Sequence, residues 1–263
     1  MSDCHNWRSN FLKATVIELF YNSGSPFSRA VRIVLAEKGL PFKRHESVVA
    51  RDISASLEIA PTLQIPTLVD AGLKLWDSAL IIEYLFSTYA NPTSVADQLP
   101  LAADYLRQAH LWHDKLTHAT LQTLCEAIVT LSQLERTGLR HEDNAFTQRC
   151  AARIQTLFDW CENQLSNATP GFVADVVSAQ DILLACCCQL LDCRALRIHW
   201  KTAQRPRLTT LVASLAHRAS FLQEPVLWWE AGIDYNDPAE YAWALAMTSK
   251  TGDSLAQWRA RRG

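Results

Sequence analysis

The sequence has almost no net charge and no long apolar run, and both absences exclude classes of function. Its 25 basic and 27 acidic side chains leave a formal charge of −2, so charge alone does not draw it to nucleic acid or to an anionic membrane surface. No stretch reaches the roughly 18 apolar residues of a membrane span, and the first 15 residues lack the apolar core of a secretory signal. We expect a cytoplasmic protein that binds neither nucleic acid nor membranes.

Cysteine occurs eight times but without the spacings of metal or disulfide sites. No Cys-x-x-Cys pair is present, and a long chain with no export signal is expected to keep its thiols reduced. The run from Cys186 to Cys188 lies in an apolar segment, and buried cysteine behaves as a small hydrophobe, so we interpret this run as core packing. Residues 15 to 90 contain no cysteine at all.

Histidine does not indicate a metal site either. His110, His113 and His118 lie in one segment with helical periodicity, where residues three apart share a face. A structural or catalytic metal needs at least three protein ligands, and no third well-spaced ligand accompanies a pair of these histidines. We therefore expect no metal.

Residues 15 to 90 have the pattern of a small α/β domain. A β-branched and aromatic run at 15 to 21 predicts a strand, and apolar residues at helical spacing from Pro26 to Lys38 predict a helix that ends at Gly39. The remaining elements are a strand at 43 to 49, a helix at 52 to 59, hairpin strands at 67 to 69 and 73 to 76, and a helix at 77 to 89. This βαβαββα order predicts one four-stranded mixed sheet.

The rest of the chain has helical patterns only. Residues 91 to 99 are a linker by composition, residues 100 to 223 predict an all-helical domain, and residues 224 to 263 form a C-terminal extension without a clear pattern. Ser178 and Asp181 have the spacing of a capping box in front of a buried helix. The other helices are expected at 101 to 130, 144 to 165 and 205 to 217.

Ser25 and Asp77 each precede a predicted helix and are explained first as caps. Ser25 stands before Pro26, a residue favoured at the first helical position. A hydroxyl at a helix N-terminus can also donate to an anion there, and a thiolate is such an anion. At Asp77-Ser78, free amides and a carboxylate can bind the two charges of an α-amino acid.

Ile65-Pro66 opens a predicted strand, a position that tolerates proline without special function. If this bond is cis, the backbone of Ile65 faces outward as an unpaired edge, to which an extended peptide can add. Together, this strand start and the helix starts at Ser25 and Asp77 predict a binding site for a peptide with a central thiol and a free amino-acid end.

These segments resemble a known family. Residues 20 to 39, 61 to 68 and 77 to 85 resemble the three signature segments of cytosolic glutathione transferases, and Ser178 to Asp181 resembles their C-terminal capping box. The resemblance extends over about residues 1 to 223. It implies a thioredoxin-like α/β domain followed by an all-α domain, glutathione as co-substrate, and a homodimer.

The resemblance implies a catalytic role for Ser25. This residue falls at the catalytic hydroxyl of serine-type members such as the theta and zeta classes, where omega-like thioltransferases have cysteine. Serine cannot form the mixed disulfide of thiol exchange, so the resemblance implies activation of the glutathione thiol for attack on a small hydrophobic electrophile, as in detoxification. Ser23 and Ser28 are nearby hydroxyls that leave the assignment open.

Binding roles follow from the same resemblance. Ile65, before a cis Pro66, would pair with the cysteinyl backbone of glutathione, and Asp77 with Ser78 would hold its γ-glutamyl end. The family more often has glutamate at the position of Asp77, and the shorter side chain is expected to lower affinity. Weaker candidates for glutathione are Gln64 and, for the glycyl carboxylate, Arg51.

Phe27, Tyr105 and Trp112 are the candidates for an electrophile pocket. Tyr105 and Trp112 are seven residues apart, so we expect them on one face of the first long helix, where core packing is an equal alternative. Two other classes of function also stay open. The first is a non-catalytic binding or scaffold protein with this fold. The second is a glutathione-dependent reductase or peroxidase that uses a cysteine from elsewhere.

Overall fold

The computed structural model describes most of the chain. It covers residues 16–46, 60–93, 98–166, 169–194, 196–228, 232–234, 237–247 and 255–262. The helix expected at 52 to 59 and the candidate Arg51 lie outside these residues. None of the helices in the described ranges combines the length and the apolar character needed to span a lipid bilayer.

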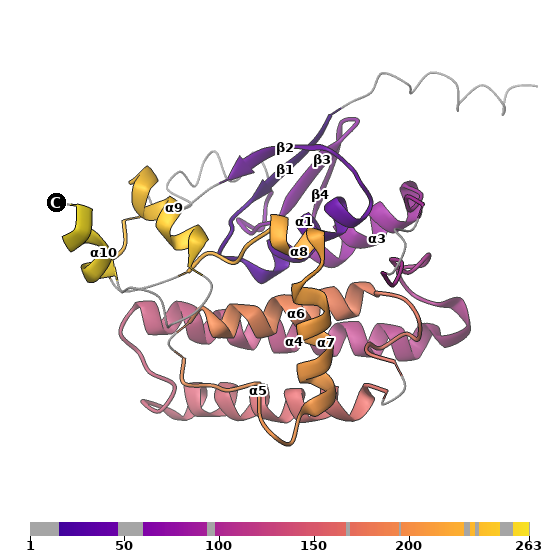
Figure 1. Ribbon diagram of the computed structural model, residues 1–263. Helices are drawn as coiled ribbons and strands as arrows, with labels where there is room; N and C mark the ends of the chain where they lie inside the picture. The colour runs from indigo at the N-terminus through magenta and orange to yellow at the C-terminus, as the bar shows by residue number, and fades with distance from the viewer. Residues whose placement is uncertain are drawn as a thin grey trace, which may run out of the picture.

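Four short strands form one mixed sheet in the order β2-β1-β3-β4 (Figure 1). Their bounds are β1 (Ile17–Tyr21), β2 (Phe42–Glu46), β3 (Thr67–Asp70) and β4 (Leu73–Trp76). β1 pairs in parallel with β2 and antiparallel with β3, which pairs antiparallel with β4. Between β3 and β4, Ala71 and Gly72 have φ of 48° and 86°, as a tight two-residue hairpin turn requires. The predicted four-stranded mixed sheet is confirmed.

α1 (Pro26–Glu37) supplies the crossover between the parallel strands and is buried on nearly every side. Val31 and Ile33 point to different sides of this helix, yet both are fully buried. α1 packs against α3 (Ser78–Thr88), which follows the sheet, and against α6 (Ala179–Asp192) of the helical part. Its position is therefore fixed by both halves of the chain.

The helical part is built around α6, whose residues are almost all buried. Figure 1 shows that α4 lies beside α6 and that α5 lies on the far side of these two helices from the sheet. α4 contacts both α5 and α6. The bounds are η1 (Gln108–His110), α4 (Leu111–Arg136), α5 (Ala145–Gln164) and α7 (Pro206–Ala216). The predicted capping box is confirmed, since Ser178 Oγ accepts from Asp181 N at 3.2 Å and Asp181 Oδ2 accepts from Ser178 N at 2.8 Å. The domain limits drawn from the sequence stay predictions.

The first long helix begins later than predicted, at Leu111 instead of Leu101, and ends at Arg136. The reason is tertiary pairing. Leu101 forms an isolated parallel bridge with Val177, and Ala102 N donates to Val177 O at 2.9 Å. These bonds hold the segment in an extended form in front of α6, although its residues have helical periodicity.

The C-terminal extension packs on the rest of the chain through a second, smaller core. α8 (Ala219–Gln223) leads into it, and Figure 1 shows α9 (Pro238–Ala246) and α10 (Leu255–Arg262) beside the sheet and helical layers. The buried members of this core are Cys193, Leu227, Trp228, Trp243, Ala244 and Leu255. The aromatic residues that had no clear pattern in the sequence therefore belong to a packed cluster.

The capping box of α6 gives a stability prediction. Asp181 is 1% exposed, and it also accepts hydrogen bonds from Phe172 N at 2.9 Å and Ser178 Oγ at 2.6 Å. Asp181→Ala leaves these donors buried without an acceptor, so we expect urea denaturation to show a loss of about 3 kcal/mol or more in the free energy of unfolding. Asn144→Ala, which removes the exposed cap of α5, is the control and should cost about 1 kcal/mol. Equal losses would contradict the prediction.

Candidate functional site

The turn between β1 and α1 presents Ser25 at the start of α1. Ser25 is the N-cap, and its Oγ accepts a hydrogen bond from Ser28 N at 3.2 Å. Pro26 follows at the first helical position, as predicted. A hydroxyl oxygen that accepts from an amide keeps its own proton to donate. The Ser25 hydroxyl can therefore donate to an anion in front of α1, where the helix dipole is positive.

The two neighbouring hydroxyls are less accessible than that of Ser25. Ser25 is half-buried, whereas Ser23 is 3% exposed and Ser28 is fully buried. The Oγ of Ser28 has no hydrogen-bond partner in the part of the chain that the structure describes. Accessibility to a ligand thus separates Ser25 from the two alternatives that the sequence left open.

Ile65 precedes a cis peptide bond to Pro66, so the predicted isomer is confirmed. Pairing of β3 starts only at Thr67. Within the described residues, the backbone of Ile65 makes no hydrogen bond. Its amide and carbonyl are available to the backbone of an extended peptide. Gln64, the weaker candidate, is exposed next to it.

Asp77 caps α3 from a strained backbone conformation. Its φ of 75° and ψ of 120° lie where residues with a side chain are rare, at a cost on the order of 1 to 3 kcal/mol. Its Oδ1 accepts from Ala79 N at 2.9 Å and from Leu80 N at 3.3 Å. Two amides that the sequence suggested for a ligand carboxylate are therefore already occupied. Ser78 is left for that role, because its amide and hydroxyl have no partner among the described residues.

The strand register brings these three segments to one end of the sheet. Phe20 near the end of β1 pairs with Thr67 at the start of β3, which pairs with Trp76 at the end of β4. Neighbouring strands lie about 4.8 Å apart, so the segments that continue from these residues start within about 10 Å of one another. Ser25, Ile65 and Asp77 follow or precede these strand ends by a few residues only.

Tyr105 and Trp112 do not share a helix face, so that expectation is wrong. The assignment of Phe27, Tyr105 and Trp112 to an electrophile pocket stays a prediction. Tyr105 lies before α4, is buried, and its hydroxyl is 2.9 Å from His118 Nε2. Trp112 lies in the first turn of α4 and is 79% exposed, with the Lys115 ammonium 5.1 Å from its ring centroid. Phe27, in the first turn of α1, is half-buried against the main core.

No described thiol is placed for chemistry. The seven described cysteines are free and buried. Burial raises the pKa of Cys186 to about 11, although Arg29 opposes this shift, so the thiol is neutral at physiological pH. The interpretation of Cys186 to Cys188 as core packing is confirmed. Among the described side chains, no three histidine, cysteine or acidic groups come together as a metal site.

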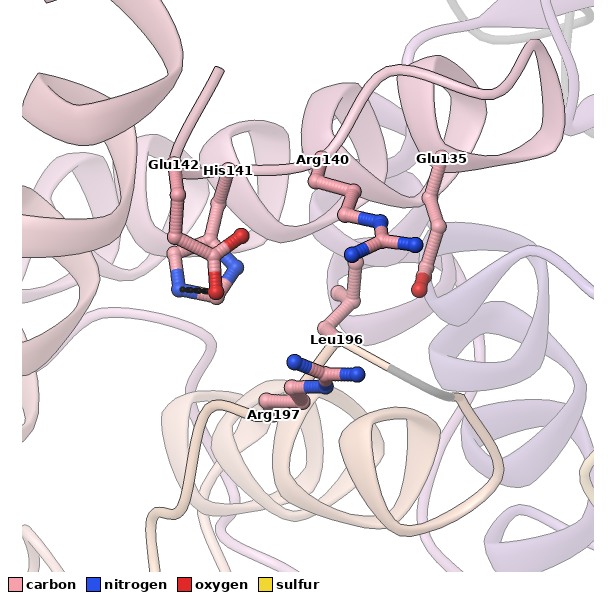
Figure 2. A pocket seen from close by; sticks show the side chains of 6 residues that line it. All are labelled: Glu135, Arg140, His141, Glu142, Leu196 and Arg197. Carbon is pink, nitrogen blue, oxygen red and sulfur yellow. Dashed lines mark ion pairs between the residues drawn. The ribbon is translucent and has the colours of Figure 1, made fainter.

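A shallow cavity of about 230 Å³ lies elsewhere, between the loop after α4 and the segment after α6 (Figure 2). Figure 2 shows the side chains of Arg140 and Arg197 on two sides of it. The residues that line it are Glu135, Arg140, His141, Glu142, Leu196 and Arg197. None of the site residues predicted from the sequence lines this cavity.

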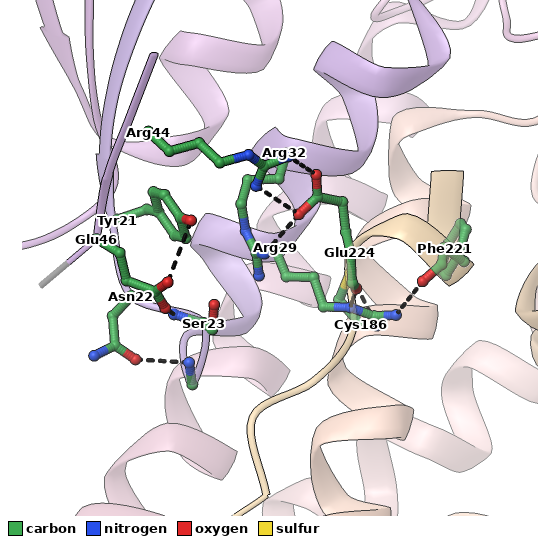
Figure 3. A network of polar contacts seen from close by, with 11 residues as sticks. Tyr21, Asn22, Ser23, Arg29, Arg32, Arg44, Glu46, Cys186, Phe221 and Glu224 are labelled. Carbon is green, nitrogen blue, oxygen red and sulfur yellow. Dashed lines mark hydrogen bonds and ion pairs between the residues drawn. The ribbon is translucent and has the colours of Figure 1, made fainter. Parts of the chain in front are cut away.

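Sequence reasoning missed residues of the extension that contact the turn before Ser25. Leu227 N donates to Ser23 O at 3.3 Å, and Arg194 Nη2 donates to Gly24 O at 3.4 Å. From the other side, Glu46 Oε1 of β2 accepts from Ser23 N at 3.1 Å (Figure 3). No local pattern in the sequence joins these positions, which lie far apart along the chain.

Glu224 anchors the extension on α1. Its carboxylate, 2% exposed, pairs with Arg32 Nη1 at 2.6 Å and also with Arg44 of β2, as Figure 3 shows. Its backbone oxygen accepts from Arg29 Nε at 2.6 Å. The charge-assisted bond to Glu224 raises the pKa of Arg44. These contacts hold Glu224 against α1 and β2.

Known proteins share this sheet and these helices. Residues 19–93 match the family model of the glutathione S-transferase N-terminal domain. The predicted resemblance is thus confirmed for the part of the chain that holds Ser25, Ile65 and Asp77.

Curated proteins are similar to this chain to different extents. The stringent starvation protein A homolog of Haemophilus ducreyi is 43% identical over 81 residues, which are 30% of this chain and 37% of that protein. The chain thus spans well under two thirds of the length of that relative. The uncharacterised GST-like protein YibF of Escherichia coli is 28% identical over 198 residues, which are 75% of this chain and 92% of that protein.

Solved structures extend the likeness beyond the N-terminal domain. A glutathione S-transferase of Methylobacterium radiotolerans, in complex with glutathione sulfonate, has a TM-score of 0.67 at 23% identity, and the match covers 84% of this chain and 99% of that chain. The likeness at this identity concerns the fold. The predicted fold class, a thioredoxin-like domain followed by helices, is confirmed.

The buried pair of Tyr105 and His118 gives a pH prediction. Burial lowers the pKa of His118 to about 4, against the pull of the Asp77 charge. The unfolded chain, with a histidine pKa near 6.5, binds more protons than the folded chain between about pH 4 and 6.5, so the free energy of unfolding falls as the pH decreases through this range. We expect urea denaturation at about pH 6.5 and at about pH 4 to show a decrease in the free energy of unfolding between the two. This decrease should be about 3 kcal/mol larger in the natural protein than in His118→Gln. His199→Gln, which changes an exposed side chain, is the control and should leave the decrease unchanged. An equal decrease in His118→Gln would contradict the prediction.

Proposed function

We propose that this chain binds glutathione across Ser25, Ile65-Pro66 and Asp77-Ser78 and that Ser25 stabilises its thiolate for attack on a small hydrophobic electrophile. The single observation that supports this most is the Ser25 hydroxyl, partly exposed at the start of α1. It accepts from Ser28 N, which leaves its proton for the thiolate. The chain is then a serine-type glutathione transferase.

The energy needed for this role is within reach of one hydroxyl and one helix start. Lowering a thiol pKa from about 8.5 by about 2 units takes roughly 2.7 kcal/mol of differential stabilisation. A hydrogen bond to a charged group supplies about 1.5 to 3 kcal/mol, and the dipole of α1 adds less than about 1 kcal/mol. Together these two contributions account for the shift.

The rest of the tripeptide has matching partners. The free backbone groups of Ile65 suit the cysteinyl residue, and the amide and hydroxyl of Ser78 suit the γ-glutamyl carboxylate. Asp77 has the charge to accept from the γ-glutamyl amino group. Gln64 is a further candidate, and Arg51, proposed for the glycyl carboxylate, lies outside the described residues.

A reductase or peroxidase is less well supported. Such chemistry needs an accessible thiolate, and all seven described cysteines are buried. The transferase reaction needs only the thiol of glutathione. The proposed transferase acts in the cytoplasm, where the glutathione pool is reducing. Its role is detoxification, and its electrophile pocket includes Phe27.

We also propose a homodimer. Trp76 at the end of β4 and Leu80 in the first turn of α3 are 38% and 55% exposed. Trp112 and Leu116, one turn apart on α4, are 79% and 61% exposed. Exposed apolar side chains in neighbouring positions are typical of a protein interface. A twofold axis buries the same patches of both copies.

The activation step predicts a specific loss in Ser25→Ala. The natural protein should show a thermal shift with glutathione and thiolate absorbance near 240 nm that titrates well below pH 8.5. Ser25→Ala should raise the pKa of the bound thiol by about 1 to 2 units, because it removes one hydrogen bond to the charged form.

Ser23→Ala and Ser28→Ala are the matched controls and should keep the low pKa. Full activity in Ser25→Ala would reject Ser25 as the activator and point to one of these two. A thermal shift without thiolate absorbance in the natural protein would favour a binding or scaffold module. The absence of any thermal shift would reject glutathione binding.

The homodimer predicts a change in mass when the apolar surface is charged. Leu116→Glu should turn a dimer into a monomer in analytical ultracentrifugation, because the carboxylate would have to be buried at the interface. Leu222→Glu changes a residue of α8 that is 68% exposed, and it should leave the dimer intact. A natural protein that sediments as a monomer at micromolar concentration would contradict the proposal.

A further inference from the structure

Arg194 lies just after the end of α6, a helix whose residues are almost all buried. It follows the C-cap Cys193, and its side chain is 5% exposed. A guanidinium this deeply buried needs acceptors for its donors, and backbone oxygens are the ones it finds. Its Nη1 donates to Cys193 O at 2.9 Å and to Leu227 O at 2.8 Å.

The same side chain reaches the turn that leads to Ser25. Arg194 Nη2 donates to Gly24 O at 3.4 Å. A Cβ added at Gly24 would lie 2.9 Å from Asn22 Oδ1, the oxygen that accepts from Gly24 N, and 3.4 Å from Arg194 Nη2, so a side chain at this position is excluded by the turn itself and not by the arginine. One guanidinium thus joins α6, the extension and the turn.

The extension segment that Arg194 holds is fixed at both ends. Glu224 is anchored by Arg32, and Trp228 N donates to Ala244 O of α9 at 3.0 Å. Between them, Leu227 donates its amide to Ser23 O. The carbonyls of Ser23 and Gly24, the two residues before Ser25, are therefore bound by one group from the extension and one from the end of α6.

We propose that Arg194 is a positioning residue, which sets the acidity of the bound thiol by holding the turn before Ser25 through its two-pronged bond to the carbonyls of Gly24 and Leu227. This inference rests on the proposed function. A hydroxyl stabilises a thiolate only at hydrogen-bond distance and angle, so a turn that moves relative to α1 weakens the bond. A rigid helix is a better support for such a group than a loop.

The test variant is Arg194→Lys, which keeps the charge but not the planar fork. An ammonium has a single nitrogen, so it cannot take the places of both Nη1 and Nη2. We expect the pKa of bound glutathione, followed near 240 nm, to rise by about 0.5 to 1 unit, the size of one hydrogen bond. Amide hydrogen exchange of the unliganded protein should also become faster in the peptide that holds residues 23 to 28.

Arg205→Lys is the matched control. Arg205 is also 5% exposed and donates to Asp159, His199 O and Gln155 O between α5 and α7, away from the turn. It should lower the melting temperature without changing the thiol pKa or the exchange of residues 23 to 28. A merely structural role of Arg194 would make the two variants alike.

An Arg194→Lys protein with the natural thiol pKa and natural exchange at residues 23 to 28 would overturn the inference. If this variant does not fold, Arg194→Gln tests the same contact, because its side chain is too short to reach both carbonyls. No change in either measurement would then overturn the inference equally. Exchange is measured without glutathione, so failure of the inference and failure of glutathione binding give different results. Faster exchange without glutathione binding in the natural protein supports the contact and rejects the proposed function.

Discussion

The burial of α1 with two arginines inside it is the constraint on which the rest of the structure depends. Arg29 and Arg32 are 4% and 2% exposed, and a buried guanidinium is costly unless oxygens accept its hydrogen bonds. Those oxygens come largely from the end of α8, since Arg29 donates to Phe221 O and Glu224 O, and Arg32 to the Glu224 carboxylate. These bonds hold the end of α8 against α1. Leu227, which follows, then lies beside the turn that carries Ser25.

The candidate site combines two kinds of support. The strand register brings Ser25, Ile65 and Asp77 to one end of the sheet, so the first part of the chain alone places the residues proposed to bind glutathione. The helical half and the extension then hold the turn before Ser25 from behind, through Arg194 and Leu227. Such a division is useful, because groups that touch a ligand need a precise geometry and gain it from neighbours whose positions are locked by packing.

Local chemistry explains which predictions from the sequence succeeded. The caps at Ser25, Asp77 and Ser178, and the turn at Ala71-Gly72, depend on residues a few positions apart, and each is found where it was expected. The prediction of a helix from Leu101 was wrong, because the backbone there bonds to Val177. For the same reason Tyr105 does not lie on the helix of Trp112. The extension could not be placed at all. It contacts Arg32, Arg44 and Ser23, which lie near the other end of the chain. The spacing of apolar residues along a sequence does not indicate contacts between such distant segments.

The sequence by itself determined the mixed sheet, the three candidate segments and the family that the first part of the chain resembles. These follow from short patterns of caps, turns and alternating apolar residues. Only the tertiary structure decided which of three serines a ligand can reach, since the burial of Ser23 and Ser28 comes from segments far along the chain. It also decided that Asp77 caps its own helix in a strained conformation. The same packing brought Arg194 to the turn before Ser25, because contacts between distant segments depend on how whole helices pack and not on local spacing.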